Sequence, residues 1–143
     1  MIARYPPNYR RVFIDTSANY ALASPQDINA SAARAISDRL KAERWRLFTT
    51  NFILAETHAL LLARRDRGVA LRVLQEITNS STVIVRVRAA DERRAQEILV
   101  QYDDKDFTLT DATSFAVMER LGISYAFAFD RDFAQYGLNV LSI

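Results

Sequence analysis

Short apolar runs, typical of buried strands, alternate along this chain with longer segments of helical periodicity, and this alternation restricts the fold most strongly. Strands are expected at residues 11–15, 46–49, 82–87, 124–129 and 138–143. Helices are expected from residue 25 onward and over 51–67, 70–77, 89–102 and 108–121. Such alternation is typical of a parallel sheet that helices cover on both faces. The predicted fold class is therefore α/β.

The length of 143 residues suits a single domain. Residues 1–10 are expected to form an irregular N-terminal arm, and residues 11–143 are expected to form the domain. Thr108 and Asp111 have the spacing of a helix capping box, which predicts a helix start at that point. Gly68 is expected to end the helix over 51–67, because glycine often terminates helices.

The composition excludes several kinds of site. Cysteine is absent and there is a single His, which excludes a disulfide framework, a zinc ribbon and a His-rich metal site. The three glycines do not form a phosphate-binding loop, so Walker-type nucleotide binding is not expected. No stretch approaches the roughly 20 apolar residues of a membrane-spanning helix, and no export signal is recognisable. We therefore expect a cytoplasmic protein that does not associate with membranes.

Four acidic residues are expected at the edge of the sheet where the strands end, which is where ligands bind in open α/β folds. Asp15 and Asp130 come at the ends of predicted strands, Asp111 lies in the first turn of a helix, and Glu56 lies in the second turn of another. Ordinary alternatives exist: Asp15 can cap a helix, Asp111 can interact with the helix dipole, and Asp130 can be a turn residue. Glu56 is harder to explain because its neighbours are apolar.

A cluster of these carboxylates needs compensation for its charge. Two carboxylates about 5 Å apart repel by roughly 3 kcal/mol at an effective dielectric constant of 20. Several such pairs would approach the total stability of a domain, ~5–15 kcal/mol. Oxygen ligands without Cys or His favour hard cations, so we expect Mg²⁺ or Mn²⁺. Cations held in this way support hydrolysis of phosphodiester bonds.

Four segments of the sequence resemble the PIN domain family, and within it the VapC-type toxins of bacterial toxin–antitoxin pairs. The segments are Phe13–Ala18, Asn51–Thr57, Leu109–Phe115 and Phe129–Phe133. Their order and rough spacing match the family from residue 11 onward. The resemblance implies a metal-dependent endoribonuclease that hydrolyses RNA with a quartet of acidic residues. Matched motif by motif, the quartet consists of Asp15, Glu56, Asp111 and Asp130.

Further residues are candidates for supporting this site. Thr16 or Ser17 is expected to orient Asp15 or hold a metal-bound water, although both can equally cap a short helix. Asp132 is a candidate fifth acidic residue. Four basic residues are candidates for contacts with the RNA backbone: Arg10, Arg11, Arg64 and Arg65. For the last two, a stabilising interaction with the helix dipole is an equal alternative.

The expected partners are an RNA substrate, a cognate antitoxin protein and a second copy of the chain in a homodimer. The alternative that the resemblance also allows is an RNA-processing nuclease outside toxin–antitoxin systems. A PIN-like scaffold that binds RNA or protein without catalysis is disfavoured because all four acidic residues are retained. A phospho-acceptor receiver domain or a haloacid-dehalogenase-like phosphatase is also disfavoured. Both need a lysine at the pocket, and Lys41 and Lys105 do not lie at strand ends.

Overall fold

The structure is a computed structural model that describes residues 10–142. Except for Arg10, the predicted N-terminal arm therefore lies outside the described residues. Within the described part of the chain, one sheet contains five strands in the order β3-β2-β1-β4-β5. The strands are β1 (Arg11–Ile14), β2 (Arg46–Thr50), β3 (Val83–Val85), β4 (Tyr125–Phe127) and β5 (Asn139–Val140). All neighbouring strands are parallel, which confirms the predicted α/β class.

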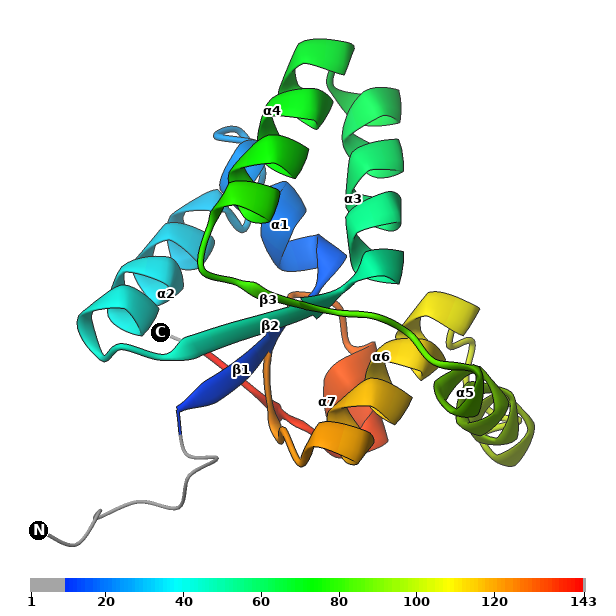
Figure 1. Cartoon of the computed structure of the whole chain (residues 1–143). Coiled ribbons are helices and arrows are strands. Elements are labelled where there is room, and N and C mark those ends of the chain that lie inside the picture. The colour runs from blue at the N-terminus through cyan, green and yellow to red at the C-terminus, as the bar shows by residue number, and fades with distance from the viewer. Residues whose placement is uncertain (1–9, 143) are drawn as a thin grey trace, which may run out of the picture.

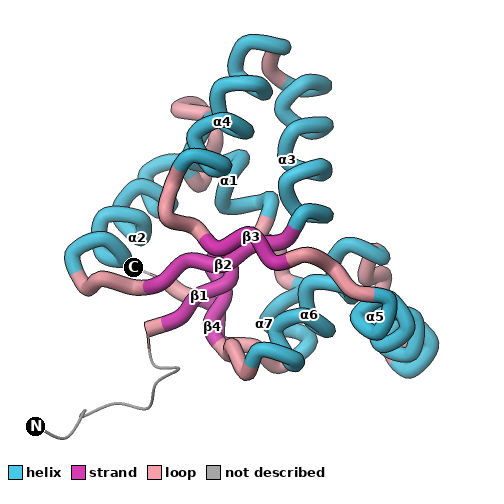
Figure 2. Tube along the Cα trace, viewed as in Figure 1, coloured by secondary structure: helices cyan, strands magenta, loops and turns pink. Residues whose placement is uncertain are grey.

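Helices cover both faces of this sheet (Figures 1 and 2). The helices are α1 (Thr16–Ala23), α2 (Ala30–Ala42), α3 (Asn51–Arg64), α4 (Arg67–Asn79), α5 (Ala89–Gln101), α6 (Leu109–Leu121) and α7 (Asp132–Tyr136). Figure 1 shows α1 to α4 on one side of the sheet and α5 to α7 on the other. None of the described helices has the length and hydrophobicity that crossing a bilayer requires.

The central strand β1 supplies side chains to the core on both faces, because successive residues of a strand point in opposite directions. Val12 and Ile14 pack with apolar residues of α1 and α2. Phe13 packs on the other face, in a cluster that includes Phe115 of α6 and Phe133 of α7. The strand is therefore apolar throughout, as expected for a parallel sheet that is buried on both faces.

Two predicted helix boundaries are wrong. The helix expected from Pro25 begins only at Ala30, because local hydrogen bonds hold the preceding residues in turns. One of these runs from the Asn29 amide to the Asp27 side chain at 2.9 Å. The helix expected to end at Gly68 already ends at Arg64, and Gly68 lies in the first turn of α4. Helix α4 starts there because the side chain of its N-cap residue, Asp66, accepts a hydrogen bond from the Val69 amide at 2.9 Å.

The order of the strands creates a switch point beside β1. From β1 the chain builds outward through β2 to β3, and it then returns to the other side of β1 to form β4 and β5. The carboxyl ends of β1 and β4 meet where the Asp15 amide donates to the Phe127 carbonyl at 3.1 Å. Ligands of open α/β sheets bind at such a switch point.

Candidate active site

Three of the four predicted acidic residues converge at the switch point. Asp15 follows β1, Asp130 follows β4, and Asp111 lies in the first turn of α6. One carboxylate oxygen of each lies within 4.8 Å of the others. Asp15 and Asp111 are buried, with 2% and 7% of their surface exposed, whereas Asp130 reaches solvent. We refer to these three residues as the acidic triad.

Ser17 holds the first member of the triad. The Asp15 side chain accepts hydrogen bonds from the Ser17 amide at 3.1 Å and from the Ser17 hydroxyl at 2.6 Å. The same hydroxyl oxygen accepts a hydrogen bond from the Phe129 amide at 2.9 Å. Asp15 is thus the N-cap of α1 and a member of the triad at once. The Ser17 hydroxyl also connects the end of β1 to the residue before Asp130.

Asp111 is held by the capping box that the sequence predicted. The Thr108 hydroxyl accepts from the Asp111 amide, and the Asp111 carboxylate accepts from the Thr108 amide, both at 3.0 Å. The bond from Thr108 occupies one carboxylate oxygen, Oδ2. Helix capping and participation in the acidic triad are therefore compatible for this residue, because the two roles use the same fixed orientation.

Asp130 and Asp132 form the remaining edge of the site. Asp130 accepts a hydrogen bond from the Asp132 amide at 3.1 Å. The carboxyl groups of Asp132 and Asp111 share a hydrogen bond when one of them is protonated. Asp132 therefore does not point away from the site, and the triad has a fourth carboxyl group in contact with it.

Burial and mutual repulsion raise the pKa of several of these carboxyl groups. Burial, followed by the charge of Asp15, raises the pKa of Asp130 to about 8. Burial and the hydrogen bond with Asp111 raise the pKa of Asp132 to about 6. Burial also raises the pKa of Asp111, although hydrogen bonds from Thr108 and Asp132 oppose this shift. In the folded protein these carboxyl groups therefore ionise less readily than free carboxyl groups, because burial and neighbouring negative charges disfavour their charged form.

The residues present fit a divalent cation. In the described part of the chain, no salt bridge to an arginine or lysine involves Asp15, Asp111 or Asp130. Their charge is thus left without a basic partner, and their donors are carboxylate oxygens, the ligands that hard cations prefer. These three residues would hold a divalent cation.

Glu56 is not part of the group of oxygens that lies within 4.8 Å. It is half-buried in the second turn of α3, which follows β2. The neighbouring residue Thr57 is buried and accepts a hydrogen bond from the side-chain amide of Asn19 at 3.2 Å. This contact fixes α3 against α1, the helix that starts at Asp15. The assignment of Glu56 to the catalytic quartet stays a prediction.

Three buried hydroxyl groups within three residues of a triad member have no hydrogen-bond partner among the described residues. They belong to Thr16, directly after Asp15, and to Thr113 and Ser114, which follow Asp111. The role predicted for Thr16 stays a prediction. Ser114 and Asn19 were not singled out from the sequence. The only indication of a role in the sequence was their spacing. Each lies about one helical turn after an acidic residue, and therefore on the same side of its own helix as that residue.

The four predicted RNA-binding arginines fall into two separate places. Arg10 and Arg11 lie at the start of β1, whereas Asp15 follows its end, so these arginines are at the opposite edge of the sheet. Arg11 donates to the Leu121 carbonyl at 2.8 Å. Arg64 and Arg65 lie at the end of α3, and Arg64 lines a cavity of about 240 Å³ together with Ser17 and Asp130.

Comparisons with known proteins identify the family to which the chain belongs. The PIN domain family model matches residues 12–138. The chain is 35% identical over 127 residues to the 23S rRNA-specific endonuclease VapC20 of Mycobacterium tuberculosis, across 88% of this chain and 94% of that protein. The crystal structure of VapC20, described as a sarcin–ricin loop cleaving toxin, has a TM-score of 0.84 and 33% identity. That match covers 92% of this chain and 99% of VapC20.

A more distant structure shares the fold. FitAcB from Neisseria gonorrhoeae has a TM-score of 0.65 at 13% identity, with 91% of this chain and 96% of that chain covered. The chain therefore belongs to the PIN domain family, and it is a homologue of the VapC-type toxin ribonucleases.

Proposed function

We propose that this protein is a Mg²⁺- or Mn²⁺-dependent endoribonuclease that acts as the toxin of a toxin–antitoxin pair. The observation that carries the proposal is the convergence of Asp15, Asp111 and Asp130 within 4.8 Å at the switch point of the sheet. When bound, a divalent cation offsets the repulsion among these carboxylates and polarises a phosphate oxygen as a Lewis acid.

The chain's own residues position the reaction. Ser17 and Thr108 hold the carboxylates of Asp15 and Asp111 in fixed orientations. A preorganised site of this kind accelerates a reaction because little rearrangement is needed in the transition state. Asp130, which reaches solvent, stands where an RNA phosphate can approach. Glu56 is proposed as the fourth member, acting from the first turns of α3.

The proposed substrate is ribosomal RNA. The support is the 35% identity to VapC20, whose name describes it as specific for 23S rRNA. RNA loops expose unpaired bases and backbone that a protein groove can bind, so a loop of structured RNA fits this class of site. A cytoplasmic location follows from the same proposal, because ribosomes are there.

An antitoxin partner is proposed from structural neighbours. Solved neighbours include VapBC-5 from Mycobacterium tuberculosis, a member of the VapBC family of toxin–antitoxin systems, at 19% identity and a TM-score of 0.60. A homodimer is also proposed. Helices α3 and α4 pack on each other through Leu61 and Val73, and they leave Leu62 and Leu71 exposed to 49% and 37%.

The test is a cleavage assay on purified ribosomes and total RNA in Mg²⁺, Mn²⁺ or EDTA. We expect discrete cuts that require the divalent cation and disappear in Asp15→Asn. The matched control is Asp38→Asn, which removes an exposed carboxylate of α2 and should cut like the wild type. Cuts that persist in Asp15→Asn and in EDTA would refute the assignment of the site. Wild-type protein that binds Mn²⁺ but cuts no RNA would favour a non-catalytic scaffold.

A further inference from the structure

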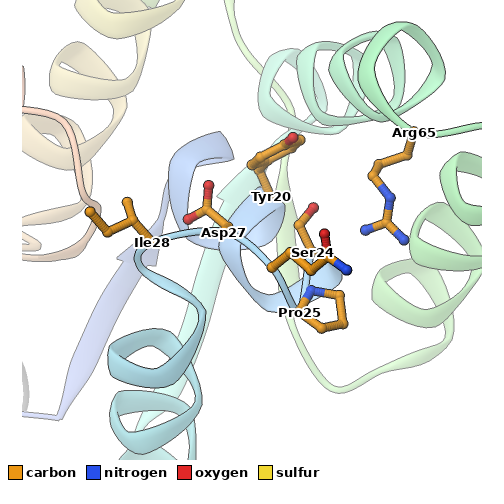
Figure 3. A pocket seen from close by; sticks show the side chains of 7 residues that line it. Tyr20, Ser24, Pro25, Asp27, Ile28 and Arg65 are labelled. Carbon is orange, nitrogen blue, oxygen red and sulfur yellow. The ribbon is translucent and has the colours of Figure 1, made fainter.

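A second cavity lies next to the acidic site, where the connection between α1 and α2 faces the end of α3. It has a volume of about 650 Å³ and is lined by Tyr20, residues 24–28 and Arg65. Figure 3 shows Ser24 and Pro25 in the connection between α1 and α2, Tyr20 above them on α1, and Arg65 at the end of α3. Its volume is sufficient for a nucleotide, and its lining contains an aromatic ring, a cation and polar groups.

The lining of this cavity overlaps with that of a smaller cavity beside the acidic triad. The smaller cavity of about 240 Å³ is lined by Tyr20 and Asp27 as well, and it also includes Ser17, Arg64 and Asp130. Tyr20 and Asp27 thus belong to both spaces. An RNA strand with a phosphate at Asp130 therefore has a path along Tyr20 into the larger cavity.

Tyr20 and the two arginines offer the contacts that an unpaired nucleotide uses. The Arg64 guanidinium lies 5.6 Å from the centre of the Tyr20 ring. Arg65 donates to the Ala23 carbonyl at 2.6 Å, which ties the end of α3 to the end of α1. Helix-dipole stabilisation explains a cation at the end of α3, but it does not explain why Arg64 lies over an aromatic ring.

Ser24 is a buried polar residue in the lining of the larger cavity. Ser24 is 5% exposed, and its hydroxyl has no hydrogen-bond partner among the described residues. A buried hydroxyl group of this kind normally has a partner. Because Ser24 lines the cavity, a ligand there can supply that partner.

Asp27 determines which part of the nucleotide lies beside it. The Asp27 carboxylate accepts from the Asn29 amide and lines both cavities. A carboxylate repels a phosphate, so the phosphates belong on the Arg64 and Arg65 side. The Asp27 side suits the edge of a base that donates N–H groups.

We propose that these two cavities bind one unpaired nucleotide of the RNA substrate next to the cleaved phosphate. Tyr20 stacks on its base, Arg64 and Arg65 bind its flanking phosphates, and Ser24 and Asp27 bind polar groups of the nucleotide. This assignment rests on the proposed ribonuclease function and names how that site selects its substrate.

The experiment measures kcat and KM for the wild type and variants on an RNA that the wild type cuts. In parallel, fluorescence anisotropy measures binding of a labelled single-stranded RNA of about ten nucleotides. We expect Tyr20→Leu to weaken binding and raise KM roughly 5- to 150-fold, the range for loss of one stacking contact. Tyr20→Phe keeps the ring and should stay close to the wild type, and kcat should change little in either.

Two further variants separate binding from folding. Ser24→Ala removes a hydroxyl that has no partner in the protein, so it should leave the thermal midpoint unchanged or higher and weaken RNA binding roughly 2- to 10-fold. Arg64→Gln should reduce the slope of log K against log salt by about one. The control is Arg34→Gln, an exposed arginine of α2 that lines neither cavity, and it should lower that slope less.

The possible failures can be told apart. If the wild type cuts RNA and Asp15→Asn does not, but Tyr20→Leu, Ser24→Ala and Arg64→Gln all bind and cut normally, the nuclease assignment holds and the nucleotide site is refuted. If the wild type cuts no RNA, the anisotropy data still decide whether the two cavities bind a nucleotide. Weaker binding in these variants but not in Arg34→Gln supports the site, and equal binding overturns it. Should Tyr20→Leu fail to fold, the exposed Arg64 carries the test.

Discussion

Replacing Asp130 by Asn should make the metal-free protein more stable while it abolishes cleavage. Burial and the charge of Asp15 raise the pKa of Asp130 from 3.8 to about 8. A carboxyl group with a raised pKa in the folded state favours folding while it is protonated. That contribution is complete below the unfolded pKa and is lost as the pH rises through about 8. In EDTA at pH 9, Asp130 is therefore ionised, and its charge lowers the free energy of unfolding.

The size of the stabilisation by Asp130→Asn follows from the rise in the pKa of Asp130. A change of about four pKa units corresponds to roughly 5–6 kcal/mol at 1.36 kcal/mol per unit. Asp130 is only partly buried, and solvent screening reduces such energies considerably. We expect Asp130→Asn to gain about 2–3 kcal/mol at pH 9 and almost nothing at pH 4. For a chain of this size the gain corresponds to roughly 6–12 °C in the thermal midpoint.

The assay is thermal unfolding of the wild type and Asp130→Asn across pH 4–9, in EDTA and in Mg²⁺. Mg²⁺ should stabilise the wild type through binding to the folded state and should stabilise the variant much less. Asp38→Asn, which removes an exposed carboxylate of α2, is the control and should follow the wild type. An Asp130→Asn variant that is less stable than the wild type at pH 9 in EDTA would show that the triad is not held under electrostatic strain.

Three further results are expected. Ser17→Ala should lower kcat roughly 10- to 100-fold in the RNA cleavage assay, because the residue that orients Asp15, a proposed metal ligand, is lost, and Ser17→Thr should restore part of kcat if the hydroxyl is what matters. Glu56→Gln should abolish cleavage in that assay without lowering the thermal midpoint, and normal cleavage would remove Glu56 from the quartet. Asp91→Ala should destabilise the protein by about 1–3 kcal/mol in urea unfolding. Asp91 is 3% exposed and its carboxylate accepts from Arg120 at 2.8 and 2.9 Å, so its removal leaves the part-exposed Arg120 without this partner, while cleavage per folded molecule should not change.

The sequence predicted those parts of the site that depend on local pattern. Asp15 and Asp130 could be placed because each ends an apolar run, and parallel strands end at a common edge. Asp111 could be placed because its capping box with Thr108 defines where α6 begins, and the structure contains both bonds of that box. These inferences needed only the direction of the strands and the first turn of a helix.

The features that the sequence did not predict depend on contacts between distant segments. Helix α2 starts later than expected because Asp27 forms a turn with its neighbours, which helical periodicity cannot reveal. The hydrogen bond from Phe129 to Ser17 joins residues that are far apart in sequence. The position of Asp132 beside Asp111 was open for the same reason, since it depends on where α7 begins after β4.

The bond between Ser17 and Phe129 has a consequence for protein synthesis. The bond spans 112 positions of the sequence. The triad also combines Asp15, which follows β1, with Asp130, which follows β4. A nascent chain that has not yet produced β4 lacks Asp130 and leaves one edge of β1 unpaired. We therefore expect a growing polypeptide to be unable to cut the RNA of the ribosome that is making it. The acidic triad can therefore assemble only after the segment that carries Phe129 and Asp130 has been synthesised.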